Sequence, residues 1–193
     1  MRLPVLCLAW LAAAAPACAP PAFAQLAEER LPACLACHGA AGTSDTPGIP
    51  SLGGQLSDYV LIQLYLFREK QRVAEPMNAM AEGLTDDDLR SLGDAMAKLP
   101  APSAAAAALD AAGLEHGRGL VAKYRCGSCH SPDFAGHDNI PRLAAQREDY
   151  LARSLTEYKS NARAAYDPAM NEVAQEVNEA DIPAIAKYIA NYR

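Results

Sequence analysis

Two short segments of this 193-residue sequence place two thiols and an imidazole at a fixed spacing. Both have the pattern Cys-x-x-Cys-His: CLACH at residues 34–38 and CGSCH at residues 126–130. Two thiols three residues apart on a helical turn can both reach one edge of a flat macrocycle, and the adjacent histidine then lies beneath its centre. This pattern predicts covalent attachment of a c-type haem. The attaching residues would be Cys34, Cys37, Cys126 and Cys129, and the histidines His38 and His130 would bind the two irons.

The two motifs belong to a repeat with a period of about 92 residues. Cys34 matches Cys126 at an offset of 92. The segment IPSLGGQLSDY (49–59) matches IPRLAAQREDY (140–150) at an offset of 91, and MNAMAEGLTDDDL (77–89) matches MNEVAQEVNEADI (170–182) at 93. Three matches in the same order indicate a duplicated domain. Because both copies carry the motif at the same place, the sequence predicts one haem in each of two similar domains.

Two other kinds of cysteine site fit the sequence less well. A structural zinc site needs four ligands, and pooling cysteines from motifs 92 residues apart would contradict the repeat. A thioredoxin-like redox pair requires alternating strands and helices, and this pattern is absent from the sequence.

The repeat also selects a second axial ligand for each iron. The first copy offers Met77 and Met80, but Met80 aligns with Val173, whereas Met77 aligns with Met170. A thioether ligand raises the redox potential relative to a second histidine and closes the iron, which suits electron transfer and opposes catalysis. We therefore expect Met77 and Met170 to be axial ligands.

The remaining methionines and histidines carry weaker signals. Met80 and Met96 are expected to pack in the core, which is the commonest role of a methionine. His116 and His137 have no counterpart in the other repeat, so we assign them no ligand role.

The first 24 residues have the features of a cleaved secretory signal peptide. Arg2 precedes an apolar run, and Ala22-Phe23-Ala24 is an A-x-A cleavage pattern that places the mature start at Gln25. Cys7 and Cys18 would leave with this segment, so no cysteine would remain for a structural disulfide. The apolar run is too short for a comfortable membrane span. We therefore expect an exported, periplasmic protein.

The net charge of the chain indicates which classes of binding partner fit it. The whole chain has a net charge of −6, and removal of Arg2 makes it −7. There is no basic patch, so nucleic-acid binding is disfavoured. The segment 25–99 has a net charge of −5 and the segment 100–193 a net charge of −2. This difference favours a partner with a basic surface for the first domain.

The apolar periodicity predicts an all-α fold. The repeat and its two haem motifs predict two tandem domains, each wrapped around one covalent haem. Helices are expected over 57–70 and 148–160, and closing helices over 85–98 and 179–192. Another helix is expected from about Asp110 to Tyr124. The segment PAPSAAAAA (100–108) indicates a linker that leads into a helix, with Ser103 as a candidate N-cap. The predicted organisation is a signal peptide (1–24), an N-terminal cytochrome c domain (25–99), a linker (100–109) and a C-terminal cytochrome c domain (110–193).

With these motifs, the chain resembles the dihaem cytochromes of the c4 type, which are built from two class I cytochrome c domains. The resemblance covers nearly all of residues 25–193 and rests on the two Cys-x-x-Cys-His motifs, the IPxLxxQ segments and the spacing from methionine to closing helix. It implies that the haems face each other across the domain interface. It also implies that Pro50 and Pro141 offer their backbone carbonyls to the ring N–H groups of the haem-binding histidines.

The first domain departs from this family pattern before its haem motif. Only residues 25–33 precede Cys34, and Pro32 lies close to it. We therefore expect the N-terminal helix of this domain to be short or missing, and the domain to be the looser of the two.

The function implied is transport of single electrons between exported or membrane-bound redox proteins, such as a terminal oxidase, a cytochrome bc1-type complex or a dehydrogenase. Such a protein is an electron carrier and not an enzyme, and it associates with a membrane only through a partner. One alternative is the cytochrome subunit of a periplasmic dehydrogenase, for example a flavocytochrome that oxidises sulfide. Two others are a dihaem peroxidase, which needs an open iron, and a haem-based sensor, although no signalling domain is attached.

Overall fold

The computed structural model describes residues 22–104, 109–163 and 166–193, and these residues form helices and loops without a named strand. The first half contains α1 (Ala22–His38), α2 (Ser57–Arg68), α3 (Met77–Ala81) and α4 (Asp86–Lys98). The second half contains α5 (Ala111–Lys123), α6 (Cys126–His130), α7 (Glu148–Lys159), α8 (Ala169–Glu176), the 3₁₀ helix η1 (Glu179–Asp181) and α9 (Ile182–Ala190). The all-α prediction is confirmed.

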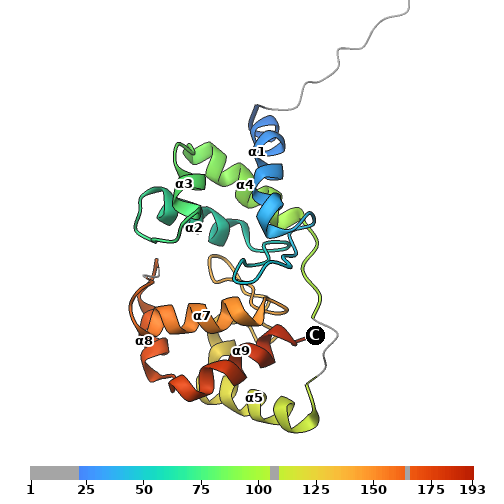
Figure 1. The fold of residues 1–193 in the computed structure, drawn as a ribbon, viewed down its shortest axis with the longest axis vertical. Helices are drawn as coiled ribbons and strands as arrows, with labels where there is room; N and C mark the ends of the chain where they lie inside the picture. The colour runs from blue at the N-terminus through green and yellow to red at the C-terminus, as the bar shows by residue number, and fades with distance from the viewer. Residues whose placement is uncertain (1–21, 105–108, 164–165) are drawn as a thin grey trace, which may run out of the picture.

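The helices pack in two groups that repeat one another. In the N-terminal domain α4 packs on α1 and α2, and in the C-terminal domain α9 packs on α5 and α7. The short helices α3 and α8 pack on α2 and α7, respectively. Figure 1 shows the two groups one above the other, with residues 99–104 running along one side of the molecule from the N-terminal group toward the C-terminal group.

The closing helices begin where the sequence places strong N-terminal signals. Thr85 caps α4 in a capping box, because its side chain accepts from the N–H of Asp88 while the Asp88 carboxylate accepts from the N–H of Thr85. In the second copy, Asn178 caps η1 by accepting from the N–H of Ala180, and α9 follows directly. The predicted helices over 85–98 and 179–192 therefore have the expected starts.

Each domain has its own apolar core, formed largely by the inner face of its closing helix. Leu89 and Leu92 of α4, both 2% exposed, pack with Phe67 in the N-terminal core. Ile182, Ile185 and Ile189 of α9 occupy the matching places in the C-terminal core. The predicted apolar stripes of both closing helices are thus buried.

The first helix is not missing, but it is short as expected: after the predicted cleavage only the nine residues 25–33 precede Cys34, whereas α5 has 13 residues. The helix α1 has 17 residues and continues without a break through the haem motif to His38. Pro32 lies inside it, and the helix packs against α4. The second domain differs at this place, because Arg125 with φ 55° separates α5 from α6. An unbroken helix that packs on α4 gives the first domain the helix contact that we expected it to lack.

The linker prediction also needs a correction at its cap. Residues 99–104 are non-helical, and α5 begins only at Ala111. Its N-cap is Asp110, whose carboxylate accepts a hydrogen bond from the N–H of Gly113 at 2.7 Å. Ser103 therefore does not cap this helix, because it lies seven residues before the residue that does.

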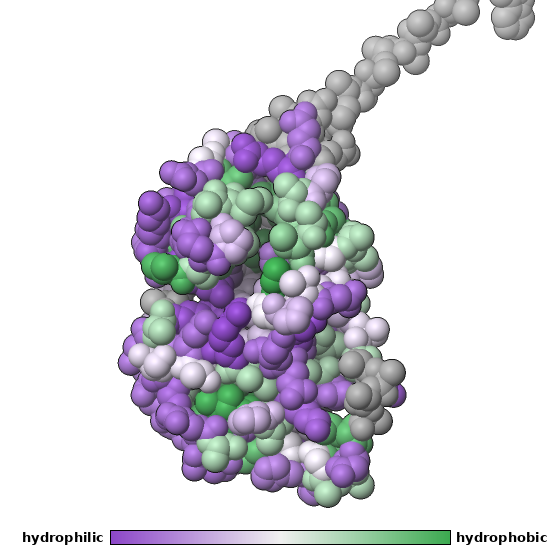
Figure 2. Space-filling model, viewed as in Figure 1, coloured by the Kyte–Doolittle hydropathy of each residue, from purple (hydrophilic) through white to green (hydrophobic). Residues whose placement is uncertain are grey.

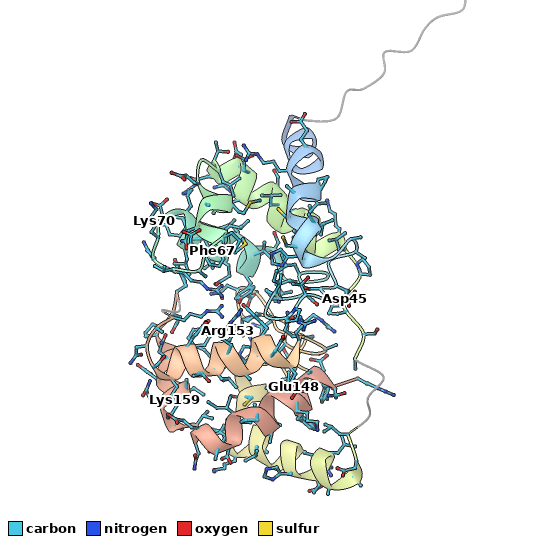
Figure 3. All side chains as sticks on the ribbon, in the orientation of Figure 1. Asp45, Phe67, Lys70, Glu148, Arg153 and Lys159 are labelled. Carbon is cyan, nitrogen blue, oxygen red and sulfur yellow. The ribbon has the colours of Figure 1, made fainter. Side chains whose placement is uncertain are left out.

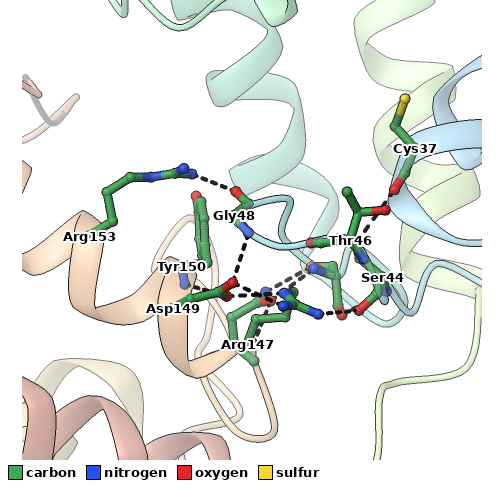
Figure 4. Close-up of polar contacts among 10 residues, drawn as sticks. Cys37, Ser44, Thr46, Gly48, Arg147, Asp149, Tyr150 and Arg153 are labelled. Atoms are coloured by element: carbon green, nitrogen blue, oxygen red, sulfur yellow. Dashed lines mark hydrogen bonds and ion pairs between the residues drawn. The ribbon is translucent and has the colours of Figure 1, made fainter.

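The two domains meet through polar contacts between loop 44–48 and the start of α7. Arg147 donates to the carbonyl of Ser44 at 3.0 Å, and Asp149 accepts from the N–H of Gly48 at 2.8 Å (Figure 4). Arg153 donates to the carbonyl of Gly48 at 2.6 Å, and Figure 3 shows its side chain extending from α7 into the boundary. In Figure 2 this boundary is a largely hydrophilic band, whereas apolar residues gather on the face of the N-terminal domain.

Most of the predicted signal peptide, residues 1–21, lies outside the described residues. Within the described part of the chain, no helix is both long and apolar enough to cross a bilayer.

Because the inner face of α9 is buried, substitutions there should lower the free energy of unfolding more than substitutions at exposed helix positions. Ile185 is 1% exposed, and replacing it with alanine removes buried methyl groups and leaves a cavity. We expect Ile185→Ala to lower the free energy of unfolding by about 2–5 kcal/mol, measured by guanidinium titration followed by far-ultraviolet circular dichroism. The control is Leu114→Ala on α5, where the leucine is 44% exposed and the loss should stay below about 1 kcal/mol. Equal losses in both variants would contradict the packing of α9 described above.

Candidate haem sites

The two Cys-x-x-Cys-His motifs are helical, and each ends at its histidine. His38 is the last residue of α1, and His130 is the last residue of α6. The first cysteine of each motif is half-buried, and Cys34 and Cys126 pack against the apolar cores of their own domains. The second cysteines, Cys37 and Cys129, are exposed, and all four thiols are free. Each motif therefore presents two unpaired thiols and an imidazole at the edge of an apolar core.

Each histidine ring is held by the carbonyl of a proline from the following loop. Nδ1 of His38 lies 2.8 Å from the carbonyl oxygen of Pro50, and Nδ1 of His130 lies 3.0 Å from that of Pro141. A carbonyl oxygen only accepts, so Nδ1 must be the protonated nitrogen in both rings. The lone pair then lies on Nε2, for which no hydrogen bond is found among the described residues. Both rings are thus arranged to offer Nε2 to a metal.

Burial keeps both imidazoles in the neutral form that binds iron. His38 and His130 are 6% and 9% exposed. Loss of solvation lowers the pKa of each ring, and the hydrogen bond to the proline carbonyl opposes this shift only in part. Since a metal-bound histidine must carry a free lone pair, the direction of both shifts suits ligation.

The thiols lack the electrostatics of a redox-active pair. Burial raises the pKa of Cys34 and of Cys126, although the positive charge of Arg30 partly opposes this for Cys34. Catalytic thiol pairs have the opposite property, because a lowered pKa supplies the reactive thiolate. The described residues also contain no group of three or more His, Cys, Asp or Glu side chains that could hold a metal ion. The raised pKa values disfavour the thioredoxin-like alternative.

The two candidate methionine ligands occupy matching places on the short helices. Met77 is the first residue of α3 and Met170 the second residue of α8, and both are partly buried. Met77 packs against the same apolar cluster as Cys34. Met96, in contrast, is 3% exposed in the core as expected, whereas Met80 is 46% exposed, so its predicted core role is wrong. Asn78 and Ala81 share the buried side of α3, and Met80 points outward because it lies two residues after Asn78, which is about 200° around the helix.

The histidines outside the motifs lie on the surface. His116 and His137 are both exposed. Nδ1 of His137 lies 3.1 Å from the carboxylate of the neighbouring Asp138. Neither position suggests a ligand role.

An asparagine that follows each candidate methionine anchors its loop, and the sequence analysis gave these residues no role. Asn78 is 5% exposed; it donates to the carbonyls of Phe67 and Arg72, each at 2.8 Å, and accepts from the N–H of Ala74 at 2.7 Å. Its counterpart Asn171 donates to the carbonyls of Tyr158 and Arg163 at 3.1 and 2.9 Å. The signal was visible as the Met-Asn pair that opens both copies of the third repeated segment.

Two buried arginines lie where the domains meet. Arg72 and Arg163 are 8% and 3% exposed, and each donates to a tyrosine of the opposite domain and to the amide of Gln63, which belongs to the same domain as Arg72. Arg72 donates to Tyr150 at 3.4 Å and to Gln63 at 2.6 Å, while Arg163 donates to Tyr59 at 3.1 Å and to Gln63 at 3.2 Å. Arg72 and Arg163 lie in the loops that precede α3 and α8, the helices of Met77 and Met170. Their contacts with Tyr150 and Tyr59 join these loops to the opposite domain.

No carboxylate side chain of the described residues pairs with either arginine, and Nε of Arg163 has no hydrogen-bond partner there. Burial by itself would raise the pKa of Tyr150, but the two guanidinium groups outweigh it and lower the pKa to about 7. Among the described residues, the two guanidinium groups therefore lack a carboxylate partner at this part of the boundary. A haem brings two carboxylates of its own, and it fits a boundary with two uncompensated buried cations.

The residues present fit two haems. Cys34 and Cys37 would hold the first one covalently, with His38 and Met77 on its iron. The second would be held by Cys126, Cys129, His130 and Met170.

Comparisons with known proteins agree with this assignment of the cofactor. The cytochrome c family model matches residues 114–193. Cytochrome c4 of Thiocapsa roseopersicina is 33% identical over 81% of this chain and 85% of its own length. A thiosulfate dehydrogenase electron acceptor of Thiomonas intermedia is 32% identical over 95% of this chain and 85% of its own length. The crystal structure of reduced recombinant cytochrome c4 from Pseudomonas stutzeri superposes with a TM-score of 0.77 at 27% identity, covering 88% of this chain and 98% of that one.

The anchoring of the Met77 loop by Asn78 predicts a specific loss of stability. Asn78→Ala leaves two carbonyls and one N–H without their partner in a buried place. We expect the free energy of unfolding to fall by about 1–3 kcal/mol, measured by guanidinium titration. The control is Asn139→Ala at an exposed loop position, which should change it by less than about 0.5 kcal/mol. If both variants unfold at the same denaturant concentration, Asn78 does not anchor the loop.

Proposed function

The chain belongs to the cytochrome c4 family of dihaem electron-transfer cytochromes, and we propose that it carries single electrons between redox proteins of the periplasm. The observation that supports this most directly is the pair of buried histidines whose Nδ1 groups are held by proline carbonyls, each beside two free thiols. We assign Cys34, Cys37, Cys126 and Cys129 to covalent attachment, and His38, Met77, His130 and Met170 to the irons.

The haem supplies an iron that changes between the ferric and ferrous states. The chain supplies a site in which this change needs little rearrangement. The proline carbonyls fix the plane of each imidazole, and the asparagines fix the loops that carry Met77 and Met170. If His38 and Met77, and His130 and Met170, hold the two irons, their coordination would stay the same in both oxidation states and no open position would remain for a substrate. This closed arrangement favours a carrier over an enzyme such as a peroxidase.

The polar boundary supports transfer between the two sites within one molecule. Loop 44–48 of the N-terminal domain is bound by Arg147, Asp149 and Arg153 of the C-terminal domain. The arginines Arg72 and Arg163 add further bonds across the same boundary. Because these contacts fix the orientation of one domain relative to the other, they would hold the two cofactors at a constant separation.

The predicted signal peptide supports the periplasmic location in this proposal. The partners are redox proteins of electron transport, either exported or bound to a membrane. The excess negative charge of residues 25–99 favours partners that present a basic surface.

Substitution of the axial methionines tests the ligand assignment. Met77→His and Met170→His replace a thioether by an imidazole, which stabilises the ferric state more strongly. We expect each variant to lower one of two midpoint potentials by on the order of 0.1 V, within the roughly 0.8 V range that axial ligands span. The measurement is a redox titration of the purified holoprotein followed by its visible spectrum.

A matched control lies on the same helix as Met77. Met80 is 46% exposed, and Met80→His should leave both potentials unchanged. If Met77→His and Met170→His also leave both potentials unchanged, the proposed distal ligands are wrong.

A second candidate function is that of an electron-accepting partner or subunit of a dehydrogenase. It is favoured by the similarity to the electron acceptor of thiosulfate dehydrogenase from Thiomonas intermedia, which extends over 95% of this chain. The two candidates differ in how the protein exists in its native host. A free carrier should elute from gel filtration as a single haem-containing chain, whereas a subunit should elute in a stoichiometric complex with a catalytic chain. Elution with a dehydrogenase that reduces it on addition of thiosulfate would replace the free-carrier proposal.

A further inference from the structure

Two buried glutamines, Gln55 and Gln146, each form two hydrogen bonds to the backbone of one residue in the opposite domain. We call each such pair of hydrogen bonds a glutamine clamp. Gln146 of the C-terminal domain is 6% exposed; it accepts from the N–H of Ser51 at 2.8 Å and donates to the carbonyl of Ser51 at 2.8 Å. Gln55 of the N-terminal domain is 5% exposed and binds Arg142 in the same way, at 2.9 and 3.0 Å. The two clamps are related by the internal repeat, because Gln146 lies 91 residues after Gln55 and Arg142 lies 91 residues after Ser51.

The clamp of Gln146 ends on the peptide group that binds a haem-ligating histidine. The N–H of Ser51 and the carbonyl of Pro50 belong to one planar, conjugated peptide unit. The N–H donates to Gln146, and the carbonyl accepts from Nδ1 of His38 at 2.8 Å. A single peptide therefore connects the amide of one domain to the imidazole of the other.

The clamp of Gln55 has the same connection in the reverse direction. The peptide unit between Pro141 and Arg142 donates its N–H to Gln55 at 2.9 Å. Its carbonyl accepts from Nδ1 of His130 at 3.0 Å. Each haem-binding histidine is thus linked to a side chain that belongs to the other domain.

The hydrogen bonds determine which way each amide points. Oε1 of Gln146 also accepts from the N–H of Arg147 at 2.9 Å, and Oε1 of Gln55 also accepts from the N–H of Leu56 at 3.0 Å. A flipped amide would place its NH₂ group against two N–H donors, so only the orientation described satisfies the network. The residues before the glutamines, Gly54 and Ala145, both have left-handed φ angles, of 61° and 57°. This shared turn directs both side chains across the boundary.

Hydrogen bonds arranged in a chain strengthen one another, by roughly 10–30% per bond in condensed phases. An acceptor at the N–H of a peptide makes its carbonyl a better acceptor, because the amide conjugation shifts electron density toward the oxygen. A stronger bond to Nδ1–H makes the imidazole a more basic metal ligand. A more basic ligand stabilises the ferric state and lowers the redox potential.

We propose that Gln55 and Gln146 are positioning residues that tune the haem of the opposite domain through the peptide that binds its histidine. This inference rests on the proposed ligation of the irons by His38 and His130. Docking of the domains then does more than hold the haems together, because it sets both potentials. Each haem has its ordinary potential only while the other domain is in place.

The test replaces each glutamine with a side chain of similar length that forms no hydrogen bonds. In Gln146→Met the potential of the N-terminal haem should rise, and that of the C-terminal haem should stay unchanged. In Gln55→Met only the potential of the C-terminal haem should rise. The two potentials are assigned to their domains by repeating the titrations in the Met77→His and Met170→His backgrounds. The matched control is Gln175→Met, where the glutamine is exposed on α8 and donates to the carbonyl of Lys159 in its own domain, and where both potentials should stay unchanged.

A second measurement reports on the histidines directly. In the proton NMR spectrum of the reduced holoprotein, Gln146→Met should shift the Nδ1–H resonance of His38 upfield and leave that of His130 in place. Gln55→Met should do the reverse. A variant that only loosened the boundary would shift both resonances.

Three outcomes would overturn the proposal: a change confined to the domain of the substituted glutamine, an equal change in both domains, or no change in potential and resonance. These outcomes are distinct from failure of the ligand assignment. If the methionine variants shift no potential, the distal ligands are wrong, whereas the histidine resonances still decide the role of the glutamines.

Discussion

The structure depends on one interaction that occurs twice: the hydrogen bond from a histidine Nδ1–H to the carbonyl of a proline. It selects the tautomer of His38 and His130, and it turns the free lone pair of each ring away from the loop. Burial adds to this by keeping both imidazoles neutral. A histidine at a helix end would be free to rotate about its side-chain bonds. The proline carbonyl of the following loop fixes the orientation of the ring.

The same loops also form the boundary between the domains, and this links ligand geometry to domain docking. Ser51 and Arg142, which directly follow the two prolines, are gripped by glutamines of the opposite domain. Loop 44–48 is bound by the charged start of α7. A boundary built on the loops that orient the histidines cannot move without affecting them.

The far side of each site is organised by different means. Met77 and Met170 lie at the starts of short helices, where no long packed helix fixes them. Asn78 and Asn171 supply that restraint by binding the backbone of the preceding helix and loop. Arg72 and Arg163, in the same loops, carry the contacts across the boundary. In each domain, the loop that binds the histidine and the loop that precedes the methionine both contact the opposite domain. Because the domains are duplicated, these contacts are similar in both.

The sequence by itself determined the elements whose signals are local. The spacing of Cys34, Cys37 and His38, and the copy 92 residues later, indicated the chemistry, and the periodic apolar residues of α4 and α9 indicated the closing helices. Pro50 and Pro141 were expected to bind the histidines only because of a family resemblance, and the structure places their carbonyls at 2.8 and 3.0 Å. These features could be predicted because each depends on the order of residues within one helix or one loop.

Other features were decided by tertiary structure, because they depend on groups that are distant in sequence. The continuous α1, with Pro32 inside it, was expected to be short or absent, and its packing on α4 is a contact that composition does not reveal. Met80 was assigned to the core, but its side chain lies outward because the turn of α3 buries the opposite side. Gln55 and Gln146 were visible in both repeated segments, yet each acts on a residue 87 or 95 positions away. A side chain that binds backbone across a domain boundary leaves no periodic pattern in the sequence, so only the docking of the two copies shows what it does.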